Sequence, residues 1–204
     1  MQSPIYRIVM GIVGVVMLIV GISQMMNGFK ELNSNGLPDE KKRASAIEKS
    51  LASMAEFTEP GGAFSMSYPT NWERNEKLEA PQILNIQDFK GVVSLSVSSE
   101  EEPKEVTTAQ YAKLTDETIA KVVAADAISD VLETDISLNG TPAKKRTHLI
   151  ASGSGKDKIN VKQVMILAAK NGRGYCITGS ALQDWFPQFE PLFNKMIESI
   201  KIKD

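Results

Sequence analysis

A run of 22 residues without a charged side chain, residues 8–29, constrains this sequence more than any other feature. Its first 15 residues, 8–22, also lack polar side chains. About 20 apolar residues in a helix cross the hydrocarbon core of a bilayer, and a helix satisfies its own backbone hydrogen bonds there. The run therefore predicts one transmembrane helix within residues 1–30. The positions expected inside the membrane are Ile8, Ile12, Val16, Ile19 and Ile22.

A cleaved signal peptide is the alternative interpretation of this run. Gly21 and Ser23 form a small-x-small pair before Gln24, where a signal peptidase could cut. The segment has no Ala-x-Ala site, however, and it is longer than the apolar core of a usual signal peptide. Basic residues flank the run on both sides, and counting them leans only weakly towards a cytoplasmic body.

The charge and the rare side chains of the sequence exclude several classes of site. The net charge is −2, and the residues after Lys30 carry 21 basic and 25 acidic side chains, a charge of −4. This balance lacks the basic surface of a nucleic-acid-binding protein. The single cysteine, Cys176, excludes an internal disulfide bond, and the single histidine, His148, excludes a two-histidine metal site.

Residues 31–57 predict a linker followed by an amphipathic helix next to the membrane. The breaker-rich stretch 33–38 ends in proline, and Asp39 is placed to cap a helix. The apolar stripe of that helix has helical spacing and consists of Ala44, Ile47, Leu51, Met54 and Ala55. Because the stripe is thin, packing on the folded domain or a role as a stalk is favoured over lying on lipid.

Alternating residues predict the first strands of a globular domain that covers residues 58–204. Residues 64–68 alternate large apolar side chains with serine and end at Pro69. Residues 83–86 form a second candidate strand. Residues 92–98 alternate valine or leucine with serine and predict a third strand.

A helix, a strand meander and a final helix complete the predicted domain. The helix extends from about residue 107 to 125, with the apolar stripe Tyr111, Leu114, Thr118, Ile119, Val122 and Val123. Four strands with short turns follow, at residues 131–138, 143–152, 159–169 and 175–181. The final helix, 184–200, has a wide aromatic face that must lie against a sheet. The order predicts an α+β fold in which helices cover an antiparallel sheet.

The pattern resembles the PsbP-like fold family. The resemblance rests on residues 64–72 (Phe-Ser-Met-Ser-Tyr-Pro-Thr-Asn-Trp), the helix from Tyr111, the four-strand meander and the closing residues 193–202. In the opening segment, the proline ends the first strand and the tryptophan folds back over the open end of the core. The resemblance covers about residues 58–203, and it implies an α/β/α sandwich that acts as a binding or assembly module of a membrane complex. The family includes PsbP itself, a nuclear-transport cofactor and DcrB-type bacterial envelope proteins.

No group of residues has the pattern of a catalytic site. Residues 153–156 (Gly-Ser-Gly-Lys) fail the phosphate-loop pattern, because Ile150 and Asp157 stand where glycine and serine or threonine are required. His148 has no nucleophile or orienting acid beside it, and Cys176 is expected to be an inert thiol in a strand. We therefore expect no enzymatic activity, no cofactor and no small-molecule substrate.

Two groups of charged residues are candidate contact sites. Glu100, Glu101 and Glu102 could attract calcium, although a solvated acidic loop that protects a sheet edge is favoured. Basic residues on two adjacent predicted strands could form one patch for acidic headgroups or a protein partner. These residues are Lys144, Lys145, Arg146, Lys156, Lys158 and Lys162. A solvated charged face is the plainer interpretation of the same residues.

Together, these features predict a single-pass protein of the bacterial plasma membrane with an extracytoplasmic PsbP-like domain and no catalytic activity. The expected partners are the lipid bilayer and another membrane or envelope protein, and nucleic acid is not among them. The alternative is a secreted or periplasmic ligand-binding protein that has lost its first 23 residues as a signal peptide.

Overall fold

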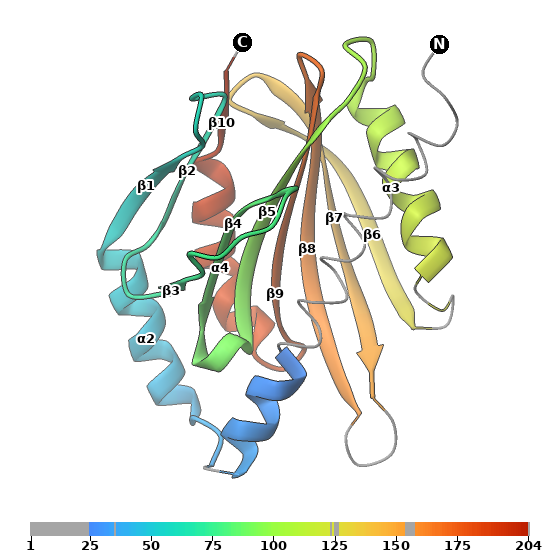
Figure 1. Ribbon diagram of the computed structural model, residues 1–204. Helices are drawn as coiled ribbons and strands as arrows, with labels where there is room; N and C mark the ends of the chain where they lie inside the picture. Colours follow the sequence, from blue (N-terminus) through green and yellow to red (C-terminus); the bar gives the residue numbers. More distant parts are fainter. Residues whose placement is uncertain (1–24, 35, 123, 125–126, 154–157, 204) are drawn as a thin grey trace.

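Two antiparallel sheets and their covering helices make up the computed structural model, which describes residues 25–34, 36–122, 124, 127–153 and 158–203 (Figure 1). The larger sheet has seven strands in the order β3-β4-β5-β9-β8-β7-β6, and the smaller has three in the order β1-β2-β10. The labelled helices are α2 (Glu40–Ala52), α3 (Thr108–Val122), α4 (Phe186–Glu198) and the short 3₁₀ helix η1 (Phe89–Gly91), and residues 25–34 form a further helix. The strands are β1 (Met54–Thr58), β2 (Phe64–Pro69), β3 (Glu73–Arg74), β4 (Gln82–Asp88), β5 (Val93–Glu101), β6 (Ile128–Leu138), β7 (Thr141–Ser152), β8 (Ile159–Lys170), β9 (Arg173–Leu182) and β10 (Lys201–Ile202).

The predicted four-strand meander is confirmed as β6 to β9. Asn139 and Gly140 join β6 to β7 with φ of 48° and 90°. Asn171 and Gly172 join β8 to β9 with φ of 53° and 78°. Two-residue hairpins of this type need a positive φ at both central residues, which Asn-Gly adopts more readily than other pairs. Local turn chemistry therefore fixes the register of these strands.

One face of the large sheet packs against α4 and forms the main core. The predicted aromatic face of α4 is buried, with Phe186, Leu192 and Phe193 fully inaccessible to solvent. Trp72 folds back onto this core as expected, and its ring meets that of Phe193 edge-on at 6.4 Å. The Trp72 Nε1 donates to Ser50 Oγ at 3.2 Å, so the polar end of a buried indole is satisfied.

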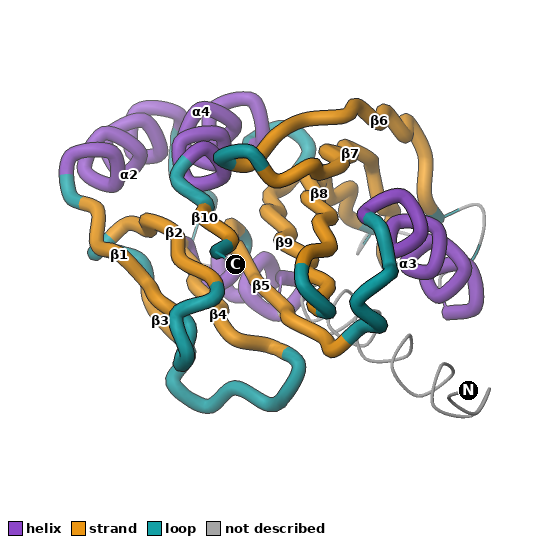
Figure 2. The backbone as a smooth tube through the Cα atoms, turned by 90° about the horizontal axis from the view of Figure 1, so that it is seen from above, coloured by secondary structure: helices purple, strands orange, loops and turns teal. Residues whose placement is uncertain are grey.

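The opposite face of the large sheet carries α3 (Figure 2). Tyr111 of α3 lies over Gly174 of β9, so closely that a Cβ on the glycine would be 2.3 Å from the ring. A second apolar cluster forms there from Tyr111, Ala112, Ile150, Met165 and Leu167. Helices on both faces of an antiparallel sheet confirm the α+β sandwich, although the strands divide into two sheets instead of one.

The boundaries of several predicted elements need correction. The helix expected to continue through Met54 and Ala55 ends at Ala52, and those two residues begin β1. The last predicted helix stops at Glu198, before the two residues of β10. Leu114, assigned to the buried stripe of α3, is 41% exposed, because α3 contacts the sheet along a narrower stripe than its sequence suggests.

The end of the long apolar run belongs to the folded domain. Residues 25–34 form a helix, in which Met25 is 1% exposed and Met26, Phe29 and Leu32 pack against the main core. The last residues of the predicted transmembrane segment 1–30 therefore belong to the folded domain, because apolar side chains fit a protein core as well as a bilayer. The membrane positions Ile8, Ile12, Val16, Ile19 and Ile22 lie outside the described residues. Within the described part, no helix combines the length and the apolar character that a bilayer span needs.

The helix predicted beside the membrane, α2, packs on the domain. Asp39 caps it by accepting a hydrogen bond from the Lys42 backbone N–H at 2.7 Å, as expected. Arg43 donates from Nε to Gln188 Oε1 at 2.8 Å, and its guanidinium lies 4.9 Å from the Trp185 ring centre. These contacts hold α2 against α4, which agrees with packing on the domain and not with a position on lipid.

Candidate functional site

A row of polar side chains crosses six strands of the large sheet on the face that carries α3. Each residue is the direct cross-strand neighbour of the next in the sheet register. We call this set the polar row, and from β3 to β7 it consists of Glu73, Gln87, Ser94, Ser180, Gln163 and His148. Ser96 and Ser98 of β5 face the same side, because side chains two residues apart on a strand share a face.

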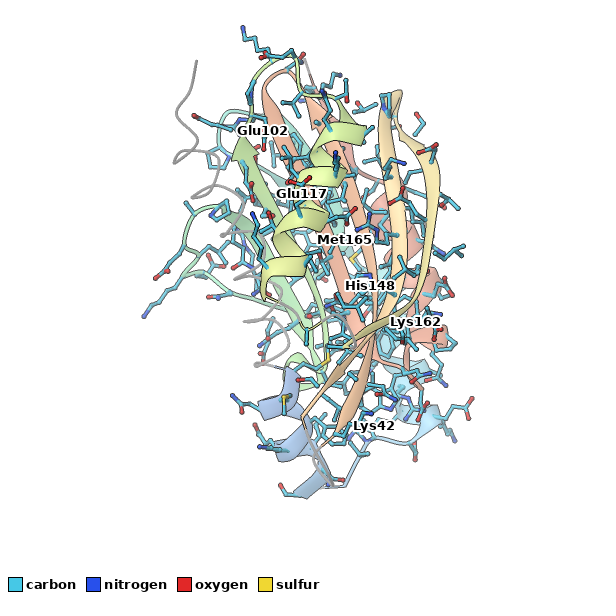
Figure 3. The ribbon with its side chains drawn as sticks, turned by 90° about the vertical axis from the view of Figure 1, so that its right-hand side faces the viewer. Lys42, Glu102, Glu117, His148, Lys162 and Met165 are labelled. Atoms are coloured by element: carbon cyan, nitrogen blue, oxygen red, sulfur yellow. The ribbon has the colours of Figure 1, made fainter. Side chains whose placement is uncertain are left out.

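Hydrogen bonds link the buried half of the polar row. Gln163 is 2% exposed, and its Nε2 donates to Ser180 Oγ at 2.9 Å. The Oε1 of Gln163 lies 3.0 Å from Nε2 of His148, which is 3% exposed. Because a carbonyl oxygen can only accept, His148 donates from Nε2 and carries its proton there. The three side chains thus connect β7, β8 and β9, and Figure 3 shows the position of His148 among these strands.

His148 is held neutral, and Gln163 separates it from the Ser180 hydroxyl. Burial lowers its pKa, since the imidazolium would lose hydration. Its Nδ1 has no hydrogen-bond partner among the described residues. The carboxamide of Gln163 stands between the imidazole and the hydroxyl of Ser180, and a carboxamide does not relay a proton at neutral pH. This arrangement lacks the direct nucleophile–base contact of a catalytic triad.

Cys176 is half-buried and Glu100 is buried on the same face. Burial raises the pKa of the Cys176 thiol to about 12, so it stays protonated and unreactive, as expected from the sequence. Burial, with a smaller effect from the charge of Glu102, raises the pKa of Glu100 to about 7. Glu100 and Glu101 belong to β5 and therefore do not form the solvated acidic loop predicted for residues 100–102. The described residues contain no group of three metal-ligating side chains.

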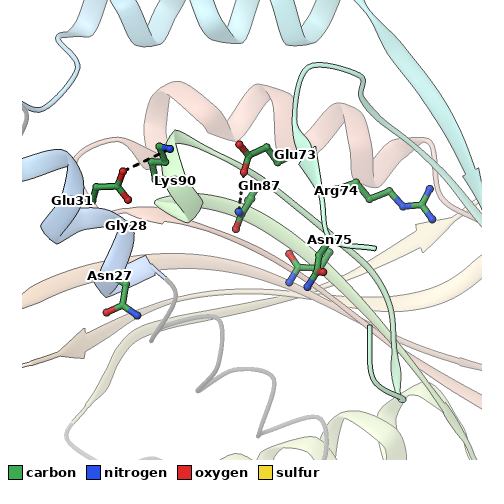
Figure 4. Close-up of a pocket in the computed structure, with 9 residues that line it drawn as sticks. Asn27, Gly28, Glu31, Glu73, Arg74, Asn75, Gln87 and Lys90 are labelled. Carbon is green, nitrogen blue, oxygen red and sulfur yellow. Dashed lines mark hydrogen bonds and ion pairs between the residues drawn. The ribbon is translucent and has the colours of Figure 1, made fainter. Parts of the chain in front are cut away.

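A cleft of about 460 Å³ opens where the polar row reaches β3 and β4 (Figure 4). It is lined by the helix at residues 25–34, by β3 with the residue after it, by β4 and by η1. The lining residues are Asn27, Gly28, Glu31, Glu73, Arg74, Asn75, Asn85, Gln87 and Lys90. Carboxamides and charges of both signs make the cleft a hydrogen-bonding surface without net charge.

Paired side chains and one glycine shape the cleft. Glu31 lies 3.7 Å from Lys90, and the Nε2 of Gln87 donates to Glu73 at 3.2 Å. Gly28 approaches η1 so closely that a Cβ would be 2.0 Å from the Lys90 carbonyl oxygen. Only glycine allows this approach, which seats the helix at residues 25–34 against the sheet.

The predicted basic patch is divided between the two faces of the sheet. Lys144 and Arg146 lie on the α3 face, where Lys144 binds Glu133 at 2.8 Å and Arg146 pairs with Asp116 and Glu133. On the other face, Lys145 donates to Asn194 of α4 at 2.9 Å.

The remaining basic residues do not join these side chains. Lys162 of β8 lies over the Phe186 ring at 5.1 Å, on the α4 face (Figure 3). Lys158 is exposed, whereas Lys156 and most of the glycine-rich turn lie outside the described residues. Alternation along a strand separates neighbouring residues, so a run of basic letters does not make one patch.

The sequence alone does not reveal the polar row, because the row depends on pairings between distant segments. The alternating serines of β5 are the one available signal, and alternation predicts a strand without showing which residues its serines face. No motif marks Gln163 or Ser180, since each is an ordinary polar residue until the strand register aligns it with its neighbours.

Comparison with known proteins identifies the fold. The sequence matches the family described as PsbP over residues 52–202. The solution structure of cyanobacterial PsbP (CyanoP) from Synechocystis matches with a TM-score of 0.59 and 14% identity, covering 74% of this chain and 94% of that chain. At this identity the likeness shows the fold alone. No curated protein matches the sequence.

Two other solved structures are similar at lower scores. Mog1p, a Ran-binding protein of Saccharomyces cerevisiae, has a TM-score of 0.49 and 11% identity, covering 74% of this chain and 96% of its own. LpqN, involved in cell envelope biogenesis of Mycobacterium tuberculosis, has a TM-score of 0.45 and 13% identity, covering 78% and 96%.

Proposed function

This chain belongs to the PsbP family, and from that membership we propose that it is a non-catalytic binding module, held at a membrane as an accessory of a protein complex. The main support for the proposal is the protonation and bonding of the two side chains that could be reactive. His148 is buried, neutral and bonded to a carboxamide, and Cys176 is a half-buried thiol with a pKa of about 12. Neither group is prepared for general base or nucleophilic chemistry.

The membrane tether of this proposal is the apolar segment that precedes the domain. Residues 8–24 contain no charged side chain, and a helix of that length spans about 25 Å at 1.5 Å per residue. This length lies at the short end of the range for bilayer spans. Because the helix at residues 25–34 packs on the core, the tether would join the domain directly, and the cleft beside Asn27 would face the membrane surface.

Carbonate extraction of cell membranes tests the tether. The full chain should stay in the membrane pellet, and a variant lacking residues 8–24 should be released while keeping the thermal unfolding of the full chain. Release of the intact full-length chain would contradict the tether. The double variant His148→Gln with Cys176→Ser is the test of the non-catalytic role, because it should co-purify the same complex as the unaltered chain.

A secreted or periplasmic binding protein is the second candidate. The small residues Gly21 and Ser23 favour it, and cleavage before Gln24 would leave every described residue in the mature chain. Mass spectrometry of the natural N-terminus separates the two candidates, since a chain that starts at Gln24 cannot be tethered by residues 8–24.

We place the tethered domain on the extracytoplasmic side of a bacterial plasma membrane. The support is the behaviour that the family resemblance implies, together with a charge of −4 on the residues after Lys30, which does not favour binding to cytoplasmic nucleic acid. Alkaline phosphatase fused after residue 204 should be active, because that enzyme matures only outside the cytoplasm. An inactive fusion that is present at normal levels would reverse the orientation.

A further inference from the structure

The two edges of the large sheet differ in length and protection. One edge is β3, a strand of two residues, which is short enough to offer little to an incoming chain. The other edge is β6, a strand of 11 residues, and within the described part of the chain it pairs only with β7 (Figure 3). Proteins usually shorten or cover such edges, because a long free edge offers unpaired backbone N–H and C=O groups to any extended segment.

The free edge of β6 is exposed along most of its length. Every residue from 129 to 135 is exposed to solvent. Val131 and Leu132 are 58% and 63% exposed, more than the other large apolar side chains exposed in the described part of the chain. Both residues lie at or beside a bulge between Ser129 and Leu132, in which Asp130 has a φ of 52°.

Charge on β6 is acidic only. The strand carries Asp130, Glu133 and Asp135 and no lysine or arginine. The bases that bind Glu133 and Asp135 come from the inner strand β7, where the side chain of Lys144 is 22% exposed against 85% for Asp135. A strand that pairs with the outer edge of β6 would therefore contact acidic side chains before it contacts basic ones.

The two sides of β6 differ in chemistry. Glu133 and Asp135 face the side of α3, where they bind Arg146 and Lys144. Leu132 and Thr134 point to the other side, because neighbouring residues of a strand alternate. An incoming strand that fits both sides must alternate basic with apolar residues.

We propose that β6 is the docking edge for an extended segment of a partner protein in which lysine or arginine alternates with apolar residues. This inference rests on the proposed role as a binding module and names the surface and the partner's chemistry. Main-chain hydrogen bonds to β6 extend the sheet, and the alternating side chains give specificity. A second copy of the chain is a poorer occupant, since it would bring three more acids and no base to the same seam.

Peptide binding to the full chain in detergent tests the proposal. The probe is a fluorescent peptide of about seven residues, alternating lysine and valine, which matches the exposed stretch 129–135. Fluorescence anisotropy should show saturable binding that weakens with added salt. Hydrogen exchange should slow in β6 when the peptide is bound. The double variant Val131→Lys with Leu132→Lys should bind at least about tenfold more weakly.

Four further comparisons make the result specific. Leu37→Lys replaces another exposed apolar side chain, 43% accessible and distant in sequence from β6, and should bind the peptide as the unaltered chain does. The same peptide with alternate backbone nitrogens methylated should not bind, because it lacks the donors for sheet extension. A glutamate–valine peptide should not bind, and Asp135→Lys should weaken binding of the lysine–valine peptide.

Several outcomes overturn the proposal. These are absence of binding, equal binding of the methylated peptide, and equal binding by the double variant. A concentration-dependent dimer that the double variant abolishes would assign β6 to a second copy instead. If the peptide fails while the full chain still resists carbonate extraction and co-purifies its complex, the docking edge is wrong and the proposed function stands.

Discussion

The two faces of the seven-stranded sheet carry a helix in a similar way but differ in chemistry. On one face, Phe193 of α4 lies over Gly179 of β9, where a Cβ would be 2.9 Å from the ring. On the other, Tyr111 of α3 lies over Gly174 of the same strand. The first face is an apolar core, whereas the second combines a small apolar cluster with the polar row.

This difference separates stability from specificity within one sheet. Apolar burial on the α4 face provides most of the driving force for folding, since it scales with the area removed from water. On the α3 face, Gln163 and His148 contribute little net energy when bonded, but each becomes costly if the strands slip and leave it unpaired. The polar row therefore favours one strand register, and the apolar face supplies the stability.

The largest expected effect comes from removing the aromatic contact on the apolar face. Phe193→Ala deletes a fully buried ring that meets Trp72 and lies 5.6 Å from the Phe186 ring centre. We expect a loss of about 3–5 kcal/mol in the free energy of unfolding, measured by denaturant titration. Leu114→Ala shortens an exposed side chain of α3. It is the matched control and should change the free energy of unfolding by less than about 1 kcal/mol. Equal losses in both variants would contradict the division between the faces.

Sequence patterns are enough to predict which residues form the apolar face of the sheet, but they do not predict the polar row. Val93, Leu95 and Val97 show their inward side by alternation, and the helical spacing from Phe186 to Ile197 shows the buried face of α4. Both patterns are local. The polar row requires the register of six strands, which depends on pairings between residues as distant as Ser94 and Ser180.

The helix at residues 25–34 shows a second limit of sequence patterns. Met25, Met26 and Phe29 end an apolar run that fits a bilayer equally well by composition. Only their packing against the core assigns them to the domain. Hydropathy measures the preference of a side chain for an apolar environment, and it does not distinguish lipid from protein interior.

An intermediate effect with an unusual pH dependence is expected at Glu100 on the polar face. Its pKa is about 7 in the folded chain, because burial disfavours the carboxylate, against an ordinary value of 4.5. The folded state then holds the proton more tightly than the unfolded state, so stability falls as pH rises from about 4.5 through 7. Glu100→Gln should remove this fall and stabilise the domain at pH 8 by up to about 3 kcal/mol, with little change at pH 4.

Thermal unfolding between pH 4 and 8 measures this effect. The neighbouring Glu101→Gln removes the same charge from an exposed side chain and should leave the pH profile unchanged. A variant at Glu100 that is destabilised at pH 8 would show that the ionised carboxylate makes favourable contacts on this face. The main core cluster consists of apolar and aromatic side chains, so its contribution should not vary over this pH range.

The smallest effect tests whether the two helices are held independently. Gly174→Ala forces a methyl group against the Tyr111 ring, and we expect α3 to shift outward at a cost of about 1–2 kcal/mol. Arg146, which binds Asp116 of α3 and Glu133 of β6, should limit that movement. Hydrogen exchange should quicken in α3 while α4 keeps its protection, because the cluster under α3 is separate from the main core.

Gly179→Ala places the same methyl group against Phe193 and Val164, and it should instead lower protection throughout the domain. If both variants speed hydrogen exchange at the same backbone amides, the two faces unfold as one unit. The faces would then differ in the polarity of their side chains but not in their stability.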